Sequence, residues 1–292
     1  MRVWAVALAA SSVSVVVASW LFRRLDGPLY EPVRGGTPRG VGIGPALVVG
    51  CLAPRWLGLP VLALALPGFV DDAVGRRFVP GLGVEVGHLA RGFGMLAAAV
   101  SAGWWFGFWT GLAVGFLPQP ANIVDTQPRA WSFAVGVASL ATLPWWTGWV
   151  GVVWAALVPY VVLDARGRVM LGDCGNSSLA VAAALACSGG DPVGVWVFVV
   201  VFVLAGAFYR FRVEPVLRRY LEGALGIPNP SFMDAVWDVV TGGALGDLVK
   251  ALTFGRTEPP EVGRVGRLLG LRRLVLIGRS SVGERVRGGD GS

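Results

Sequence analysis

Long runs of apolar residues alternate with short polar segments along most of the chain. We expect nine membrane-crossing helices, because an α-helix that spans a bilayer needs about 20 mostly apolar residues. The run at 41–53 reaches a spanning length only if it extends into the glycines before it. The nine runs lie at 3–22, 41–53, 57–70, 88–103, 104–118, 131–143, 145–163, 177–189 and 193–209.

The first run, 3–22, also has the position of a secretory signal peptide, because Arg2 precedes it. Its length is that of a full span, and it ends at Arg23 and Arg24, a pair typical of the flank of a retained helix. We therefore expect this segment to remain in the protein as its first membrane helix.

Arginines are unevenly distributed among the segments that connect the apolar runs. If the helices cross the bilayer in turn, every second connection collects most of them, and loops rich in arginine face the cytoplasm. This predicts an N-terminus outside and a C-terminus inside. The predicted inner segments contain Arg23, Arg24, Arg34, Arg39, Arg76, Arg77, Arg129, Arg166, Arg168, Arg210, Arg212, Arg218 and Arg219, whereas the outer ones contain Arg2 and Arg55.

Composition leads to the same class of protein. The 292 residues are 54% hydrophobic and 15% charged, and the mean hydropathy is +0.65. Soluble domains carry about 25% charged residues, so we predict an all-α, polytopic membrane bundle of about nine to ten helices in the cell membrane. The net charge of +7 lies between apolar runs, which argues against nucleic acid as a partner. Three cysteines and one histidine exclude a disulfide framework and a multi-histidine metal site.

The C-terminal part differs in pattern from the rest. Residues 211–255 are amphipathic, so a tenth membrane helix there is left open. We expect a transmembrane domain over 1–255 and a basic cytoplasmic tail over 256–292. In the tail, Leu268, Leu269, Leu271, Leu274 and Val275 alternate with Arg264, Arg267, Arg272, Arg273 and Arg279. This pattern suits an interfacial helix on anionic lipid, and a disordered basic tail is the alternative for the last dozen residues.

Candidate chemistry lies in the polar segments of the predicted inner side. Asp71 and Asp72 directly follow the apolar run 57–70. Adjacent carboxylates repel each other near a low-dielectric medium unless a cation or a shared proton relieves them. The pair suits Mg²⁺–phosphate chemistry, or a base that takes a proton from a phosphate acceptor. Simple solvation of a loop is the alternative.

Two further segments combine an acid with amide or glycine residues. Asn122, Asp125 and Arg129 lie within eight residues and could hold a base, a ribose or a phosphate, unless Asp125 is an ordinary helix cap. Asp173 lies between Gly172 and Gly175.

These glycines allow close backbone approach, and the following helix N-terminus offers amides to an anion. Asp173 is thus a candidate Mg²⁺ ligand, with Asn176 beside it; a glycine-rich turn capped by Asn176 is the alternative. The basic glycine loop at 34–40, with Arg34 and Thr37, either binds a phosphate or closes a turn.

Taken in order, these four segments resemble the polyprenyl-phosphate N-acetylhexosamine-1-phosphate transferases, which include the enzymes that start peptidoglycan, teichoic acid and O-antigen synthesis. The resemblance covers about residues 33–179. Residues 34–40 (RGGTPRG) resemble K-x-G-T-P-x-x-G, and 68–72 (GFVDD) resemble G-F-x-D-D. Residues 122–125 (NIVD) are similar to N-x-x-D, and 170–176 (MLGDCGN) to M-G-D-x-G-S.

The resemblance implies a Mg²⁺-dependent transfer of sugar-1-phosphate from a UDP-sugar to polyprenyl phosphate, with UMP leaving, as the first membrane step of cell-envelope glycan synthesis. It implies that Asp71 and Asp72 are the acceptor-activating and metal-proximal pair and that Asp173 binds Mg²⁺ with Asp72. The implied substrate-binding residues are Asn122, Asp125, Arg129, Arg34, Thr37, Gly172, Gly175 and Asn176. The expected partners are polyprenyl phosphate, a UDP-sugar and membrane lipids, and a homodimer is left open.

The chain also departs from the family. The two D-G motifs that usually follow N-x-x-D are replaced by 126–129 (TQPR), and the histidine-rich loop is absent because His88 is the single histidine. A catalytically inactive homologue that acts as a membrane scaffold or regulator is therefore the alternative. A transporter is disfavoured because the acids lie at loop boundaries. A CDP-alcohol phosphotransferase is disfavoured because 164–167 (DARG) lacks the further aspartates of that family.

Overall fold

A computed structural model of the protein describes residues 2–25, 27–31, 37–74, 77 and 85–278. Over these residues the chain is mostly helical, and its one β-element is the antiparallel ribbon of β1 (Tyr30–Glu31) and β2 (Thr37–Pro38). The chain divides into two compact units, Met1–Phe202 and Val203–Ser292. The domain boundary predicted at residue 255 stays a prediction.

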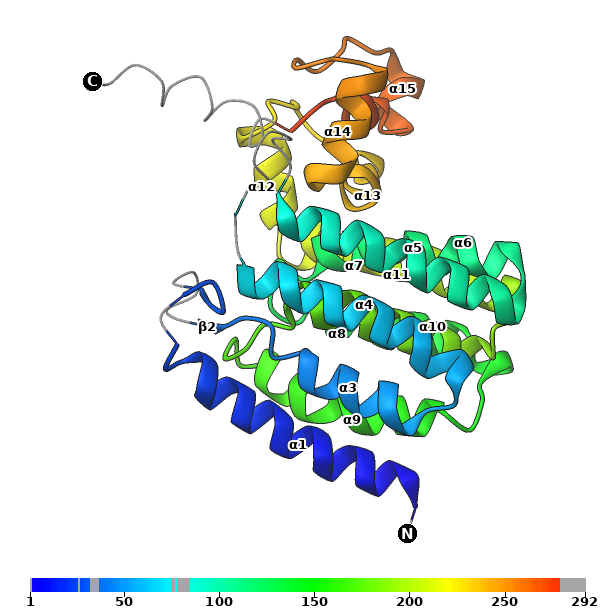
Figure 1. The fold of residues 1–292 in the computed structure, drawn as a ribbon. Helices are drawn as coiled ribbons and strands as arrows, with labels where there is room; N and C mark the ends of the chain where they lie inside the picture. The colour runs from blue at the N-terminus through cyan, green and yellow to red at the C-terminus, as the bar shows by residue number, and fades with distance from the viewer. Residues whose placement is uncertain (1, 26, 32–36, 75–76, 78–84, 279–292) are drawn as a thin grey trace. The chain divides into compact units, whose positions relative to one another are not determined.

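Helices of the first unit lie side by side in Figure 1. They are α1 (Val3–Phe22), α3 (Ile43–Leu52), α4 (Arg55–Val74), α5 (Val86–Phe106), α6 (Phe108–Phe116), α7 (Pro118–Val124), α8 (Ala130–Ala141), η1 (Leu143–Trp145), α9 (Val150–Asp164), α10 (Gly172–Ser188) and α11 (Pro192–Phe208), which runs across the unit boundary. Each of the nine predicted apolar runs coincides with at least one of these helices, so their helical character is confirmed. The run 104–118 is divided, because Gly107 has a φ of 90° and Pro118 begins α7.

Among the described residues, three helical segments are long and apolar enough to cross a membrane: Val3–Phe22, Arg55–Val74 and Pro192–Val213. Three shorter helices are also apolar: Ile43–Leu52, Ala130–Ala141 and Val150–Asp164. The length and composition of these helices are consistent with a membrane protein. The predicted count of nine to ten spans and the N-outside orientation stay predictions.

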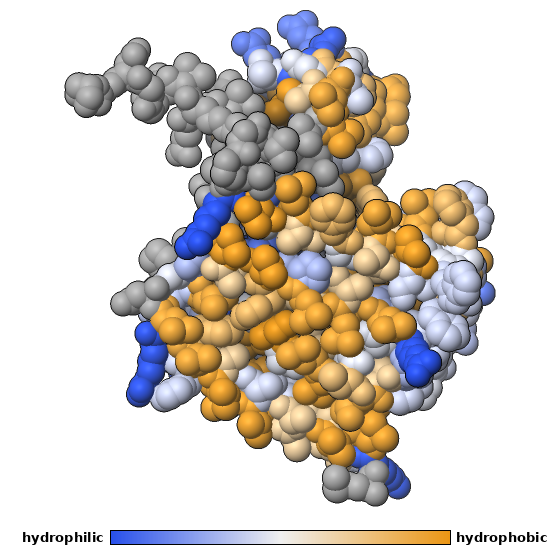
Figure 2. Space-filling view, in the orientation of Figure 1, coloured by the Kyte–Doolittle hydropathy of each residue, from blue (hydrophilic) through white to orange (hydrophobic). Residues whose placement is uncertain are grey.

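Large apolar side chains cover the outside of the first unit. Val13 and Val16 on α1 are each 64% exposed, Phe93 on α5 is 70% exposed, and Trp104 is 84% exposed. Figure 2 shows a broad hydrophobic surface over these helices. Soluble monomers rarely expose contiguous apolar patches of this kind, so the surface fits contact with lipid.

Helix α10 is the centre of the first unit, because all of its 17 residues are buried. It packs against α3, α4, α7, α8 and α9. Its small side chains permit this, since they let neighbouring backbones approach closely. At Gly68 of α4, an added Cβ would lie 2.6 Å from Cα of Cys174, and at Gly42 it would lie 2.4 Å from Cα of Gly175. The glycines therefore set how closely α4 and α3 approach the first turn of α10.

The second unit contains short helices held by buried ion pairs. Its helices are η2 (Tyr209–Val213), α12 (Val216–Gly223), α13 (Phe232–Thr241), α14 (Gly243–Thr253), α15 (Arg264–Leu268) and α16 (Leu271–Val275). Arg272 Nη2 lies 2.7 Å from Asp234 Oδ2, and Arg273 Nε lies 2.7 Å from Asp238 Oδ1. Lys250, near Asp247, is 2% exposed. Burial, together with the charge of Arg273, lowers the pKa of Lys250 to about 8.

These pairs correct one expectation from the sequence. Arg272 and Arg273 were expected to face anionic lipid on an interfacial helix, but they are only 4% and 1% exposed. The reason is that Asp234 and Asp238 project from one face of α13 and α16 packs against it. A guanidinium buried with a carboxylate partner is far less costly than one buried alone. Within the described part of the tail, only Arg264 and Arg267 of the predicted lipid-facing arginines remain exposed.

We expect Gly68→Ala to lower the free energy of unfolding by about 1–3 kcal/mol, because the new methyl group meets backbone atoms of α10 that cannot move aside. Thermal unfolding of the purified protein, followed by circular dichroism, measures the change. Gly92→Ala on α5 is the matched control, because a Cβ there has nothing within 4 Å; it should leave stability unchanged or raise it by up to about 1 kcal/mol. Equal effects of the two variants would contradict the close approach at Gly68.

We expect Asp238→Asn to destabilise the second unit by about 3 kcal/mol, because the buried Arg273 loses its nearest carboxylate. Hydrogen exchange of amides in Phe232–Thr241 measures the local opening. Glu222→Gln is the control: it removes the exposed pair with Arg218, and exposed pairs contribute about 0.5 kcal/mol or less. Unchanged amide exchange in Asp238→Asn would show that the buried ion pair is not needed for the stability of the second unit.

Candidate active site

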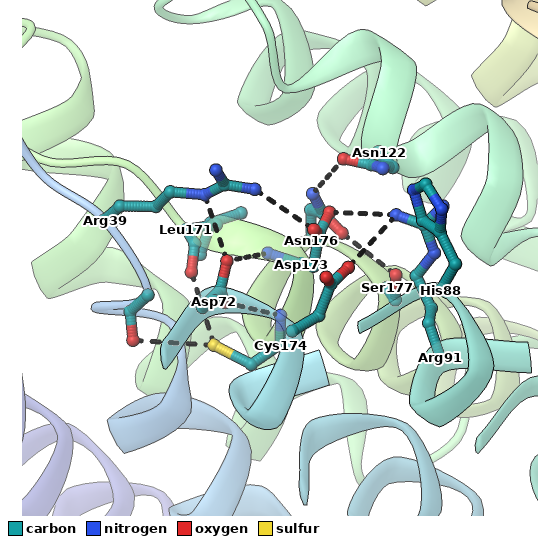
Figure 3. Close-up of polar contacts among 12 residues, drawn as sticks. Arg39, Asp72, His88, Arg91, Asn122, Leu171, Asp173, Cys174, Asn176 and Ser177 are labelled. Atoms are coloured by element: carbon teal, nitrogen blue, oxygen red, sulfur yellow. Dashed lines mark hydrogen bonds and ion pairs between the residues drawn. The ribbon is translucent and has the colours of Figure 1, made fainter. Parts of the chain in front are cut away.

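Five charged side chains from four separate parts of the first unit meet at the N-terminal end of α10 (Figure 3). They are Arg39 from the segment after β2, Asp71 and Asp72 from the last turn of α4, Arg91 from the second turn of α5, and Asp173 from the first turn of α10. We call this set the acid–arginine cluster. Three carboxylates and two guanidiniums give it a formal charge of −1.

Asp72 is fully buried and binds the first turn of α10. Its Oδ1 accepts a hydrogen bond from the backbone N–H of Asp173 at 3.0 Å, and its Oδ2 accepts one from Cys174 at 3.0 Å. The first amides of an α-helix have no partner within the helix and favour a negative charge. Asp72 therefore acts as a capping carboxylate supplied by a different helix.

Glycine is required at two positions for this contact to form. Gly172 has a φ of 72°, and a Cβ there would lie 2.5 Å from Asp72 Oδ2 and 2.6 Å from the backbone nitrogen of Gly40. Gly175 lies against Gly42, because a Cβ added at Gly175 would lie 2.5 Å from Cα of Gly42. Both glycines were expected to allow close backbone approach to a substrate. In the structure, the partner that approaches them is the chain itself.

The segment after β2 is held against residues 170–171 by backbone hydrogen bonds. Met170 N–H donates to Pro38 O at 2.9 Å, and Gly42 N–H donates to Leu171 O at 3.1 Å. This pairing positions Arg39, whose Nε lies 3.0 Å from Asp72 Oδ1 and whose Nη2 lies 3.1 Å from Asp173 Oδ2. Arg39 thus bridges the two buried acids while its side chain stays 34% exposed.

Arg91 bridges the other pair of acids. Its Nη1 lies 3.4 Å from Asp173 Oδ1 and 3.6 Å from Asp71 Oδ2. Asp71 is 12% exposed, whereas Asp72 has no exposed side-chain surface. The two adjacent aspartates of the sequence motif therefore have different surroundings, with Asp72 inside the fold and Asp71 at its edge.

Amide side chains adjoin the cluster on the α7 side. Asn176 Nδ2 donates to Asn122 Oδ1 at 3.1 Å, and Ser177 Oγ donates to Asn176 Oδ1 at 2.9 Å. Figure 3 shows both asparagines beside Asp173. The structure thus brings together five segments that the sequence separates by up to about 140 residues, with Asn122 and Asn176 as the link between α7 and α10.

The other predicted site residues are not members of the acid–arginine cluster, and one of them lies outside the described residues. Arg129 has a φ of 66°, its N–H donates to Asp164 Oδ2 and its Nε donates to Ala165 O, so its side chain is bound at the end of α9. Asp125 is buried at the C-terminal end of α7, and Thr37 is buried in β2. Arg34 lies outside the described residues.

Sequence reasoning missed the role of Arg91 and left Arg39 out of the site. A signal for Arg91 was present, since it is one charged residue inside the apolar run 88–103, and an ionisable residue within such a run usually has a functional or paired role. Arg39 had no comparable signal, because arginines are common on the inner side of membrane helices. Its role becomes visible only from its distances to Asp72 and Asp173.

The donor set of the cluster suits a hard divalent cation in part. Mg²⁺ takes oxygen ligands and is usually held by one or two carboxylates together with substrate phosphates. Asp173 Oδ1 is buried with no hydrogen-bond partner among the described residues and lies 3.4 Å from Arg91 Nη1, and Asp71 Oδ2 lies 3.6 Å from the same nitrogen. These two acids are therefore the ones that could hold such an ion. Both oxygens of Asp72 already accept backbone amides. Within the described ranges, no three His, Cys, Asp or Glu side chains are grouped as a ready-made metal site.

We expect Asp72→Asn and Asp71→Asn to differ sharply in their structural effect. In Asp72→Asn, the new side-chain amide nitrogen would face a backbone N–H, which leaves a buried donor unsatisfied at a cost of about 1–3 kcal/mol. Amide exchange in residues 172–178 should therefore accelerate by about 5- to 150-fold in Asp72→Asn. Asp71→Asn, its neighbour without such contacts, should leave this exchange near the wild-type rate. If both variants behave alike, Asp72 does not cap α10.

No protein-family model matches the chain, and no curated protein matches it. The likeness to the polyprenyl-phosphate sugar-1-phosphate transferases therefore rests on the four motifs in the sequence. All four motifs contribute residues to one place in the fold, with Arg39 from the first motif and Asp71, Asp72, Asn122, Asp173 and Asn176 from the other three.

Proposed function

We propose that the protein is a Mg²⁺-dependent enzyme that transfers sugar-1-phosphate from a UDP-sugar to polyprenyl phosphate and releases UMP. The observation that carries the proposal is the acid–arginine cluster, in which residues of the predicted motifs converge from separate helices. Chance likeness of short motifs gives no reason for their side chains to meet, whereas a shared reaction centre does.

Arg39 and Arg91 suit the charge of these substrates. The donor carries a diphosphate and the acceptor a phosphate, so the reacting groups repel each other in a medium of low dielectric. Guanidinium groups bind phosphate oxygens with two parallel hydrogen bonds and stay charged at any physiological pH. In the proposed reaction, Arg39 and Arg91 exchange part of their contact with the carboxylates for contact with the phosphates.

The three aspartates have different roles in the proposed reaction. Asp71, at the edge of the fold, takes a proton from the acceptor phosphate. An oxygen of that phosphate then forms a bond to the phosphorus that carries the sugar, and the bond from this phosphorus to the UMP oxygen breaks. Asp72 is a positioning residue, because it fixes the first turn of α10 and with it Asp173. Asp173 and Asp71 would hold Mg²⁺, which when bound supplies charge neutralisation for the transferring phosphoryl group.

Residues around the cluster supply neutral hydrogen-bonding groups. The linked pair Asn122 and Asn176 adjoins Asp173 and could bind the nucleotide or the diphosphate through its amides. Asp125 and Arg129 stay predicted substrate contacts. The motif residues lie in or beside the connections that are rich in arginine, and such connections usually face the cytoplasm. We therefore infer a multi-pass protein of about nine to ten spans, with its N-terminus outside and the reaction on the cytoplasmic face.

A second function is favoured by the same distances. Each of the three carboxylates has a guanidinium within 3.6 Å, so the cluster is nearly neutral without any substrate or cation. Buried ion-pair networks of this kind also occur as fixed structural elements. On this alternative the chain is an inactive homologue that acts as a membrane scaffold or regulator, as the missing histidine loop also suggests.

The purified protein in detergent should release UMP when it is given undecaprenyl phosphate, Mg²⁺ and the correct member of a panel of UDP-N-acetylhexosamines that includes UDP-MurNAc-pentapeptide. Release should stop when EDTA removes Mg²⁺ and return when Mg²⁺ is restored. Asp71→Asn should lower kcat by about 10²- to 10⁴-fold, the usual contribution of a general base. The measurement is UMP formed per enzyme per second.

Asp191→Asn is the control, because Asp191 lies outside the acid–arginine cluster and its carboxylate accepts a hydrogen bond from the N–H of Gly194 at the start of α11. It should retain wild-type activity. UMP release that does not need the lipid acceptor would indicate a hydrolase and contradict the proposal. A well-folded protein that releases no UMP with any donor would favour the scaffold or regulator.

A further inference from the structure

The second unit contains a groove between the loop before α13 and the segment that leads into α15. Two adjoining hollows of about 600 and 630 Å³ form it, and they share Val262, Gly263, Arg267 and Arg272 as lining residues. Asn229 and Arg264 line the second hollow, and Glu261 lines the first. Neither hollow involves any residue of the acid–arginine cluster.

Three arginines and one acid are among the residues that line this groove. Arg264 and Arg267 are exposed, so their guanidinium groups are available to a ligand. Arg272 is 95% buried, since its side chain is 5% exposed, and it donates from Nη1 to Pro228 O and from Nη2 to Asn229 O and Asp234 Oδ2. Its Nε is buried without a hydrogen-bond partner among the described residues. Arg264 and Arg267 are therefore the donors that a ligand in the groove can reach.

Apolar side chains adjoin these arginines on and after α15. Val265 is 70% exposed, Leu268 64% and Leu269 52%. Figure 2 shows strongly hydrophilic and hydrophobic side chains next to one another on the visible face of the second unit. Exposed apolar residues that alternate with arginines are the pattern of a surface that inserts at the boundary between lipid headgroups and acyl chains.

We propose that this groove binds the phosphate of an anionic phospholipid headgroup, with Arg264 and Arg267 as donors and with Val265, Leu268 and Leu269 inserted beside it. A soluble phosphate would gain no binding free energy from the exposed apolar side chains, whereas a lipid gains it both from the arginines and from the apolar side chains.

Chain connectivity also favours a lipid as the occupant. The second unit starts within Pro192–Val213, a segment able to span the membrane, so it is tethered at a membrane surface.

This lipid site is independent of the proposed reaction, and binding to the full-length protein tests it. A Cys51→Ser background removes the exposed native cysteine, and Leu269→Cys carries an environment-sensitive dye next to the groove. Short-chain phosphatidylglycerol is titrated into the detergent micelle, and the dye signal gives an apparent Kd. Phosphatidylcholine should bind far more weakly. Arg264→Gln/Arg267→Gln should weaken phosphatidylglycerol binding by about 30-fold, because each arginine near an anionic lipid contributes about fivefold.

Arg218→Gln/Arg219→Gln is the matched control. It also removes two exposed positive charges from the second unit, but on α12 and outside the groove, so the Kd should stay within about twofold of the wild type. Equal weakening by both double variants would show a general charge effect and overturn the site. A response to glycerol phosphate as strong as the response to phosphatidylglycerol would show a soluble anion as the occupant and overturn the lipid assignment.

Discussion

The contact between the Asp72 carboxylate and the first turn of α10 is the interaction on which the rest of the first unit depends. It joins the end of α4 to the start of the most buried helix, and Gly42, Gly68 and Gly175 allow the backbones to come close enough for it to form. Because its negative charge is used to hold a helix terminus, Asp72 cannot be regarded as a free acid. Asp173, Arg39 and, through them, Arg91 take their positions from this contact.

The two neighbouring aspartates of the motif have different surroundings. Asp72 is inside the fold and Asp71 is at its edge, although they differ by a single step along the same helix. Successive residues of a helix point about 100° apart, so one residue can face the core while the next faces an opening. A motif of two adjacent aspartates therefore provides one buried acid that caps α10 and one acid at the edge of the fold, and the second is the one assigned to chemistry in the proposed reaction.

Much of the fold could be predicted from the sequence, because its strongest signal is the length of apolar runs, and each run became helix. The boundaries at Gly107 and Pro118 depended on local backbone chemistry that a hydropathy pattern ignores. The candidate site was predictable where residues form motifs, as for Asp71, Asp72, Asp173 and Asn176. Arg39 and Arg91 needed three-dimensional distances. Arg272 and Arg273 were misassigned to lipid because their partners, Asp234 and Asp238, lie more than 30 residues away.

The burial of Lys250 determines how the protein reacts with reagents that label amines. Lys250 is the single lysine of the chain and is 2% exposed, next to Asp247 and Arg273. Reagents that acylate amines, including most cross-linkers, will therefore find no accessible lysine on the native protein within the described residues. Acylation of Lys250 requires the second unit to open, so the rate of that modification reports how often this unit opens while the first unit stays folded.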